Sequence, residues 1–371
     1  MSKPIDIHAL VDLVSSQQAL LTQFLANLSP NNANTSSTLP PNPPNPLHVL
    51  RDSATLLKAH TTKLSLLLIN KPFTATAVQK VLRDVSGTCL PAMMSAVEIC
   101  QPEVWGSFLR HQVTARVRAV MREMDVCFNE VLQIATQELD SGSKPKPERS
   151  ERTGGKQESA RDTLTSTGVV WDACDALIEL ESVGIGGLAV QRAGEWRDMI
   201  KDAIEELKEW EEGDAEDDDD DDDQDEESDA VSDDQDDKDS IENMFSAANA
   251  LPKNRPDLKK QLATANDKLK KIVMLYAALI KRRLKTFSPS AASIKDNIAT
   301  LDRLITTLKE LPESVDELAT SFYDLDSDQV GQVMTKCLEK ARYAADLVKL
   351  NWDGKEDEFT TWTNKWLDVI K

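Results

Sequence analysis

The sequence contains few residues of the kinds that build β-sheets. It has 13 glycines in 371 residues and only 5% aromatic residues, whereas Leu, Ala, Lys, Glu and Asp are abundant. This composition is poor in strand formers and rich in helix formers. No segment alternates apolar and polar residues for long enough to make a strand. The sequence therefore predicts an all-α fold.

The sequence also lacks the usual signals of a disulfide framework and of a membrane-spanning segment. The five cysteines are odd in number, widely spaced and without a C-x-x-C pair, so neither a disulfide framework nor a zinc site is predicted. The strongest apolar run, LSLLLI ending at Ile69, is far shorter than the ~20 residues that span a bilayer. The N-terminal MSKPIDIHALVDL has no continuous apolar region typical of a signal peptide. We expect buried, reduced cysteines in a protein without a membrane-spanning segment.

Catalytic and metal-binding patterns are missing too. The stretch D-L-D-S-D from Asp324 has the first three carboxylates of an EF-hand loop, but Gln329 stands where glycine is needed and Thr335 where the bidentate glutamate belongs. The four histidines form no H-x-x-x-H pair. We therefore predict no catalytic, cofactor-binding or metal-binding residues, no cofactor, and a protein that is not an enzyme.

Acidic residues are abundant, but they are concentrated in one place. Between Glu211 and Asp239 there are 20 Asp and Glu and one Lys, while the whole chain has a net charge of -21. Like charges and scarce apolar groups predict a disordered segment. It acts either as a spacer and solubiliser, or as a polyanion that binds basic partners such as histone tails. In the second case the binding weakens as the salt concentration rises. Direct binding to nucleic acid is disfavoured by a pI of about 4.7.

Apolar residues elsewhere recur at helical spacing and predict roughly ten helices in two antiparallel bundles joined by the disordered acidic linker. We expect an N-terminal helix with an Asn- and Pro-rich connector at 1–46, a first bundle at 47–210 with a flexible loop at 140–160, the linker at 211–255, and a second bundle at 256–371.

Particular helices follow from particular residues. Gly87 with Pro91 predicts a kink, and one long helix is expected from Pro102 to Leu139. Two helices are expected at 162–182 and 188–210, and Pro312 is expected near the start of a helix of its own.

The segment from Ile294 to Leu308 repeats apolar residues in steps of four and three, the seam of a coiled coil, which another helix of the same bundle or a partner protein could cover. The cluster KRRLK at Lys281 is either the charged face of a helix, with Lys281, Arg282 and Lys285 toward solvent, or a nuclear-import signal.

The stretch TSTGVVWDACDAL, from Thr165 to Leu177, combines a cysteine, a tryptophan and two aspartates. On a helix, Val170, Cys174, Leu177 and Ile178 share one side with Trp171 at its margin, whereas Asp172, Asp175 and Glu179 lie opposite. Since the acids point away from the thiol, this geometry predicts core packing on one face and solvent on the other.

The same stretch resembles the cyclin-D-binding protein family, also called the Grap2- and cyclin-D-interacting protein family (GCIP, HHM or Maid). The order of segments matches from about Leu47 to the C-terminus, and Thr167 to Asp175 is the specific part. The resemblance implies an all-helical, non-enzymatic protein of nucleus and cytoplasm whose partners are D-type cyclins and helix-loop-helix transcription factors.

Three functions remain open at this point. The first is an interaction protein that regulates cell-cycle or transcription factors by binding them on helical bundle surfaces. The second is a chaperone of histones or other basic proteins that binds them through the acidic run. The third, which rests on fold analogy alone, is a cytoskeletal adaptor similar to vinculin and catenin. The partner, the binding surface and the oligomeric state are not predicted.

Overall fold

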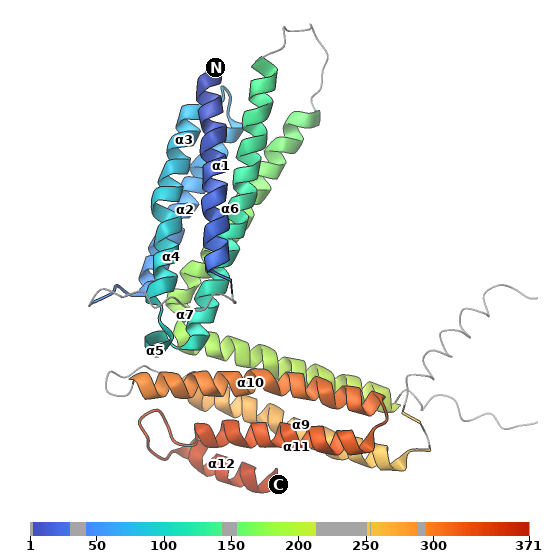
Figure 1. Cartoon of the computed structure of the whole chain (residues 1–371). Coiled ribbons are helices and arrows are strands. Elements are labelled where there is room, and N and C mark those ends of the chain that lie inside the picture. Colours follow the sequence, from blue (N-terminus) through green and yellow to red (C-terminus); the bar gives the residue numbers. More distant parts are fainter. Residues whose placement is uncertain are drawn as a thin grey trace, which may run out of the picture. The chain divides into compact units, whose positions relative to one another are not determined.

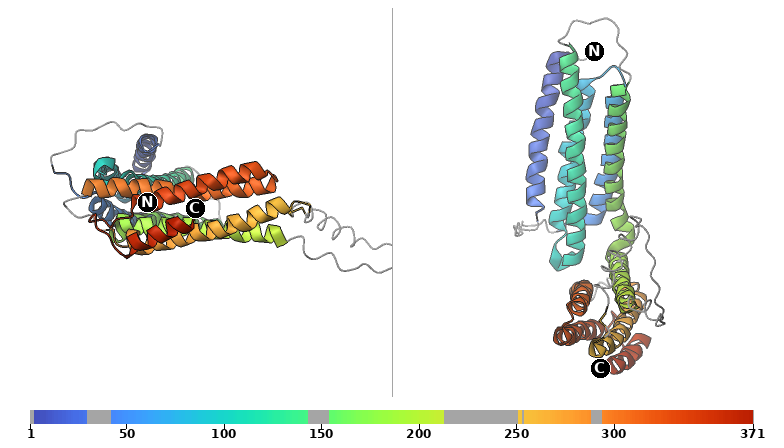
Figure 2. Two further views of the ribbon diagram at one scale, coloured as in Figure 1. Left: turned by 90° about the horizontal axis from the view of Figure 1, so that it is seen from below. Right: turned by 90° about the vertical axis from the view of Figure 1, so that its right-hand side faces the viewer.

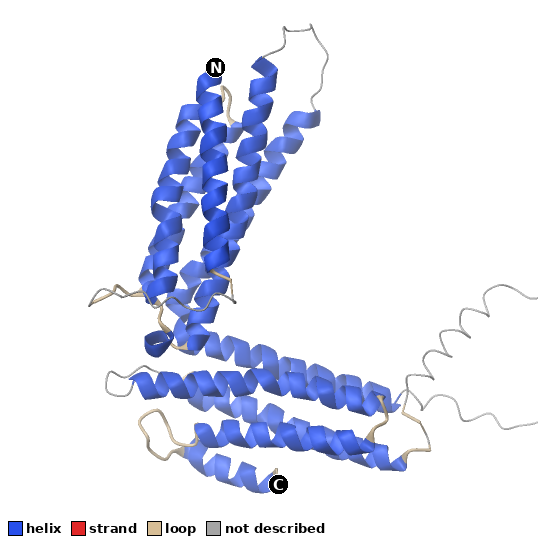
Figure 3. Ribbon diagram, in the orientation of Figure 1, coloured by secondary structure: helices blue, strands red, loops and turns tan. Residues whose placement is uncertain are grey.

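The computed structural model describes residues 3–29, 42–142, 154–212, 251–252, 254–287 and 294–370, and the regular elements within these ranges are all helices (Figure 3). The chain divides into two compact units, Met1–Ile185 and Gly186–Lys371 (Figure 1). The predicted all-α class with two helical bundles is confirmed. Most of the predicted linker, much of the connector before residue 46 and part of the loop at 140–160 lie outside the described residues.

The boundary between the units differs from the prediction. It lies between Ile185 and Gly186, so the segment 188–210 belongs to the second unit rather than to the first. Likewise, the N-terminal helix is part of the first bundle and not a separate element ahead of it. The reason is that apolar contacts, and not the position of the acidic run, decide which helices share a core.

Unit 1 is a bundle in which α1 packs against α6 and α3, and α2 packs against α3 and α4 (Figure 2). Pro4, Pro46 and Pro102 occupy the first positions of three of its helices, where a missing backbone N–H costs nothing. Its elements are α1 (Pro4–Asn27), α2 (Pro46–Ile69), α3 (Ala75–Asp84), η1 (Val85–Cys89), α4 (Leu90–Ile99), α5 (Pro102–Trp105), α6 (Ser107–Gly142) and the first part of α7 (Gly154–Glu212).

Two breaks interrupt the helices of unit 1. At Gly87, where a kink was expected, the helix changes to the π-helical turn η1 between α3 and α4 and continues. The prediction of one long helix from Pro102 is wrong in its first turn. Gly106 has a φ of 84° and separates the short helix α5 from α6. A residue with a Cβ rarely adopts this conformation, so the glycine fixes the start of α6 at Ser107.

α7 carries the third break. The helix loses its regular geometry at Gly184, where φ is 62° and ψ is 179°. Its first part belongs to unit 1 and its second part to unit 2. The two helices expected at 162–182 and 188–210 are therefore confirmed, with a glycine between them.

Unit 2 consists of the second part of α7, α9 (Pro256–Leu279), η2 (Ile280–Leu284), α10 (Ile294–Tyr323), α11 (Ser327–Leu347) and α12 (Glu358–Val369). The four longer segments lie side by side, and α12 covers one edge of the bundle (Figure 1). Trp210 of α7 contacts Phe322 and Tyr323 of α10, with ring centroids 6.3 and 5.4 Å away. These contacts place the second part of α7 in the core of unit 2.

The seam from Ile294 to Leu308 is covered within the molecule. Ile298, Leu301, Ile305 and Leu308 are buried, and α10 packs mainly against α11. The two helices are joined by a short turn, which makes them antiparallel neighbours. The intramolecular partner that the sequence left open is thus a helix of the same bundle.

Pro312 does not begin a helix, as the sequence suggested, but lies inside α10. A proline there has no N–H to give to the carbonyl four residues earlier, which is Leu308. The buried hydroxyl of Tyr276 on α9 donates to that carbonyl oxygen at 2.5 Å. The freed backbone acceptor is therefore satisfied by a side chain of a neighbouring helix, and α10 continues through the proline.

Candidate interaction surfaces

The stretch that carries the family resemblance lies on α7 and has the two faces that the sequence predicted. Val170, Cys174 and Leu177 are fully buried, and Trp171 at the margin is 36% exposed. Asp172, Asp175 and Glu179 are exposed on the other side. The prediction that the acids point away from the thiol is confirmed.

Some acids of this region are used to hold α7 in the bundle. Lys58 on α2 donates to both carboxylate oxygens of Asp175 at 2.6 and 2.7 Å. One nitrogen of Arg51, also on α2, donates to both oxygens of Glu181 at 2.8 and 2.9 Å. These pairs link α7 to α2 at the surface of the bundle, so their carboxylates already have partners within unit 1.

The cysteines are not reactive thiols in the folded protein. All five are buried and free. Burial raises the pKa of the Cys89 thiol to about 11, and it raises the pKa to about 12 for Cys100, Cys127, Cys174 and Cys337. At neutral pH these side chains are protonated, and they fill the core as small apolar groups.

One of the acids from Asp324 onward caps a helix. Asp326 lies in the turn between α10 and α11, and its carboxylate accepts a hydrogen bond from the N–H of Gln329 at 2.9 Å. In the part of the chain that the structure describes, no three His, Cys, Asp or Glu side chains come together as a possible metal site.

The KRRLK cluster is divided between surface and core. Lys281, Arg282 and Lys285 are exposed, as predicted, but Arg283 is only 1% exposed. The cluster lies on the π-helical turn η2, whose extra residue in the turn changes the direction of the side chains. The burial agrees with the spacing of the apolar residues, since position 283 follows Leu279 by four on the apolar stripe of α9.

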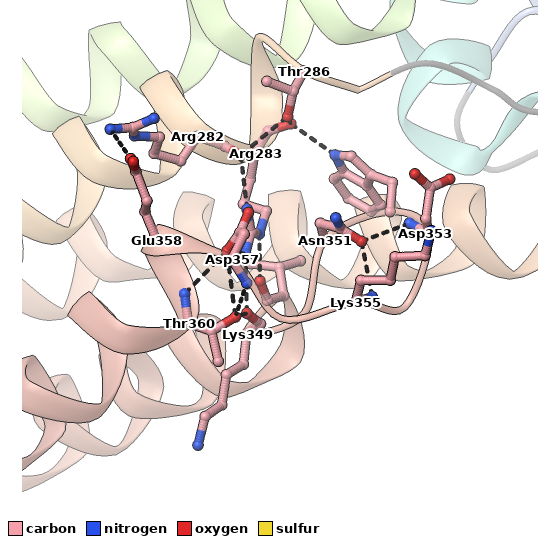
Figure 4. Close-up of polar contacts among 12 residues, drawn as sticks. Arg282, Arg283, Thr286, Lys349, Asn351, Asp353, Lys355, Asp357, Glu358 and Thr360 are labelled. Carbon is pink, nitrogen blue, oxygen red and sulfur yellow. Dashed lines mark hydrogen bonds and ion pairs between the residues drawn. The ribbon is translucent and has the colours of Figure 1, made fainter.

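Arg283 is the centre of a polar network that joins η2 to the segment between α11 and α12 (Figure 4). Its guanidinium donates to both carboxylate oxygens of Asp357 at 2.8 and 2.9 Å. It also donates to the carbonyl oxygens of Val348 at 2.6 Å and Lys349 at 2.9 Å. The carbon of the guanidinium lies 4.3 Å from the ring centre of Phe359 on α12. A buried cation is thereby given an anion, two carbonyl acceptors and an aromatic face.

Asp357 links this network to the start of α12. Its carboxylate accepts from the N–H of Thr360, and the Thr360 hydroxyl accepts from the N–H of Asp357, which is a capping box. The hydrogen bond from Arg283 holds the pKa of Asp357 at about 2, with a further contribution from Thr360. The carboxylate is therefore ionised at any physiological pH, and it positions the first turn of α12.

The indole of Trp352 closes the other side of the network. Its Nε1 donates to the carbonyl oxygen of Arg283 at 2.8 Å. Its ring packs edge-on against that of Phe287, with 4.8 Å between the ring centroids. The network thus fixes the segment 348–357 and the start of α12. We find a structural role for these residues, because each polar group contacts another part of the same bundle.

Comparison with known proteins gives a family match for part of the chain. The family described as "Grap2 and cyclin-D-interacting, N-terminal" matches residues 49–213. The resemblance is confirmed over this segment. The match ends close to residue 210, where the sequence placed the end of the first bundle, and it therefore includes the part of α7 that packs in unit 2.

A relative covers more of the chain. An uncharacterized protein of Schizosaccharomyces pombe is 26% identical over 326 residues, which are 87% of this chain and 83% of that protein. The similarity therefore extends well beyond the family segment and into unit 2. No helix within the described ranges is long and apolar enough to cross a membrane.

Proposed function

We propose that the protein is a non-enzymatic regulator that binds D-type cyclins or helix-loop-helix factors on the surface of its helical bundles. The match of residues 49–213 to the cyclin-D-interacting family carries this proposal. The buried, protonated cysteines and the structural use of Arg283 and Asp357 agree with it, since the groups with the most perturbed chemistry support the fold.

The exposed side of α7 offers the best surface for such a partner. Trp171 lies in the family-specific stretch and is 36% exposed, and Val169 nearby in sequence is 42% exposed. Partially exposed tryptophans are the residue type that most often dominates a protein interface. Asp172 and Glu179 on the same side form no ion pair with other described residues, so they are available to cations of a partner.

Binding of a D-type cyclin to the full-length chain tests the proposal. Trp171→Ala should weaken the affinity by about thirtyfold if the side chain contributes ~2 kcal/mol to the interface. The matched control is Tyr343→Ala, which removes another exposed aromatic ring outside the family segment. Circular dichroism of both variants checks that the helices are intact.

Deletion of residues 213–239 separates this function from the acidic chaperone that the sequence left open. Binding through the bundle surface predicts that the deletion and moderate salt change the affinity little. If cyclin binding is absent, and basic proteins bind instead through the deleted segment, the proposed function is wrong.

The family resemblance also implies residence in both nucleus and cytoplasm, and we propose the same distribution here. The burial of Arg283 argues against KRRLK as an accessible import signal in the folded protein. A fluorescent fusion in cells tests the distribution. Replacing Lys281, Arg282 and Lys285 by Gln should leave it unchanged if entry depends on a partner.

A further inference from the structure

One side of α9 and η2 carries a row of lysines. At 100° per residue the three in α9, Lys259, Lys260 and Lys270, fall within about 100° of arc. Two more, Lys281 and Lys285, follow at the turn η2. All of them are exposed, whereas Leu262, Leu269 and Ile272 are buried on the opposite side. We call this side the basic face of α9, and it consists of Lys259, Lys260, Lys270, Lys281 and Lys285.

Few acids of the bundle neutralise this face. Asp267 is 3.5 Å from Lys270, and both side chains are largely exposed, so this pair is weak. The other four lysines of the basic face form no ion pair with any described residue. Two of them, Lys259 and Lys260, lie in the first turns of α9, where the helix dipole already favours an anion. The face therefore lacks a counter-charge within the described part of the molecule.

The chain contains a segment of the opposite charge that is tied beside this helix. The backbone N–H of Leu251 donates to the carbonyl oxygen of Trp210 at 3.2 Å. The described residues on the two sides of 213–250 are therefore close to each other, a few residues before Pro256 begins α9. Both ends of the segment are anchored in unit 2.

The segment is long enough to follow the whole basic face. From Pro256 at the start of α9 to Lys285 after η2, the helix extends over about 45 Å at 1.5 Å per residue. About half of the segment, extended from its anchored ends, reaches roughly 60 Å. Lys281 and Lys285 at the far end of the helix are therefore within its range.

We propose that the acidic segment 213–239 docks on the basic face of α9 of the same chain. Charge complementarity and the anchoring at Leu251 and Trp210 favour this occupant over a separate molecule, because the segment is always present at a high local concentration. A basic protein that binds the acidic segment must then compete with the lysines of α9. The contact therefore regulates any binding through the acidic segment, and it goes beyond the proposed binding of cyclins.

Carboxyl-to-amine cross-linking of the intact chain with a water-soluble carbodiimide tests the contact. This reagent joins a carboxylate to a lysine only when the two are in contact. We expect cross-links from residues 213–239 to Lys270, Lys281 and Lys285, which decrease at high salt. Lys63 and Lys80, which are exposed on unit 1, serve as the control.

A binding experiment gives an independent measure. The probe is a labelled peptide of ten lysines, and its affinity is measured for the full chain. The pair Lys281→Gln and Lys285→Gln should raise the affinity by about threefold or more, because less of the acidic segment is occupied within the chain. The pair Lys63→Gln and Lys80→Gln changes the net charge equally and should leave the affinity close to that of the unchanged protein.

Several results would overturn the proposal. Cross-links that form between two chains, that stop at Lys259 and Lys260, or that are equally frequent at Lys63 and Lys80 exclude docking along α9. Equal effects of the two substitution pairs on the lysine peptide exclude competition. Since none of these measurements uses a cyclin, failure here is distinct from failure of the proposed function.

Discussion

Removal of the Tyr276 hydroxyl is expected to destabilise unit 2 because the group replaces a missing backbone donor. The hydroxyl is buried and donates to the carbonyl of Leu308, which Pro312 leaves without its helical partner. In Tyr276→Phe this acceptor remains buried and unsatisfied, which costs about 1–3 kcal/mol. The ring itself is retained, so packing changes little.

A double-mutant cycle isolates the cause. Pro312→Ala supplies an N–H that can bond to Leu308, and it should stabilise α10 by up to about 3 kcal/mol because alanine replaces proline inside a helix. In that background the hydroxyl is redundant. Tyr276→Phe should then lower the free energy of unfolding by less than about half of the amount that it does in the unchanged protein. The difference between the two losses is the coupling energy.

Hydrogen exchange with mass spectrometry across a urea series is the appropriate assay, since it reports on peptides of α9 and α10 separately from unit 1 and does not assume one transition for the whole chain. Tyr343→Phe, which removes an exposed hydroxyl, is the control. If Tyr276→Phe costs the same in both backgrounds to within ~0.4 kcal/mol, the explanation by the proline is refuted.

Three further predictions concern other contacts. Arg283→Met should destabilise unit 2 by about 1–3 kcal/mol, because the carbonyls of Val348 and Lys349 lose their donor and Asp357 loses its cation. Arg282→Met, which loses only an exposed pair with Glu358, should cost under about 1 kcal/mol in the same urea titration. The pKa of Asp357 is lowered to about 2 from 3.8, so its stabilisation is present above about pH 4 and lost as pH falls toward 2; stability should decline by ~1–2 kcal/mol over this window, and Asp357→Asn should remove that decline. The five buried thiols should resist alkylation at pH 7.5 and react fully in denaturant, as counted by mass spectrometry, because their pKa values are about 11 or 12.

Much of the fold could be predicted because periodic apolar residues decide which face of a helix is buried. The stripe at Val170, Cys174 and Leu177 and the seam at Ile298 and Leu301 are buried as the pattern indicated. The break between the two parts of α7 was also visible, since glycines interrupt the stripe near residue 184.

The errors share one physical cause, which is tertiary context. The change of composition at the acidic run predicts a boundary there, yet Trp210 next to it packs on Phe322 in unit 2. The missing donor of Pro312 predicts a helix start, because a proline is favoured at that position. Only the neighbouring Tyr276, 36 residues earlier in the sequence, shows why it is tolerated inside α10.

The burial of Arg283 was the feature of the candidate surfaces that the sequence did not predict. KRRLK contains four similar charges, and its composition does not separate Arg283 from its neighbours. Its position depends on the π-helical turn and on acceptors supplied by residues 348–357, more than 60 positions later. The signal available was the spacing of four from Leu279, which placed an arginine on the apolar stripe.

The distribution of charge limits what a partner of the α7 surface can be. Asp175 and Glu181 are already paired with Lys58 and Arg51, so a partner cannot gain their full charge without breaking contacts that hold α7 in the bundle. The groups left over in the family-specific stretch are Trp171 and the acids beside it. A partner that combines an apolar pocket for the indole with one or two cations fits this surface, whereas a purely basic polymer would gain little there, because exposed charges are screened by salt and contribute weakly without apolar burial.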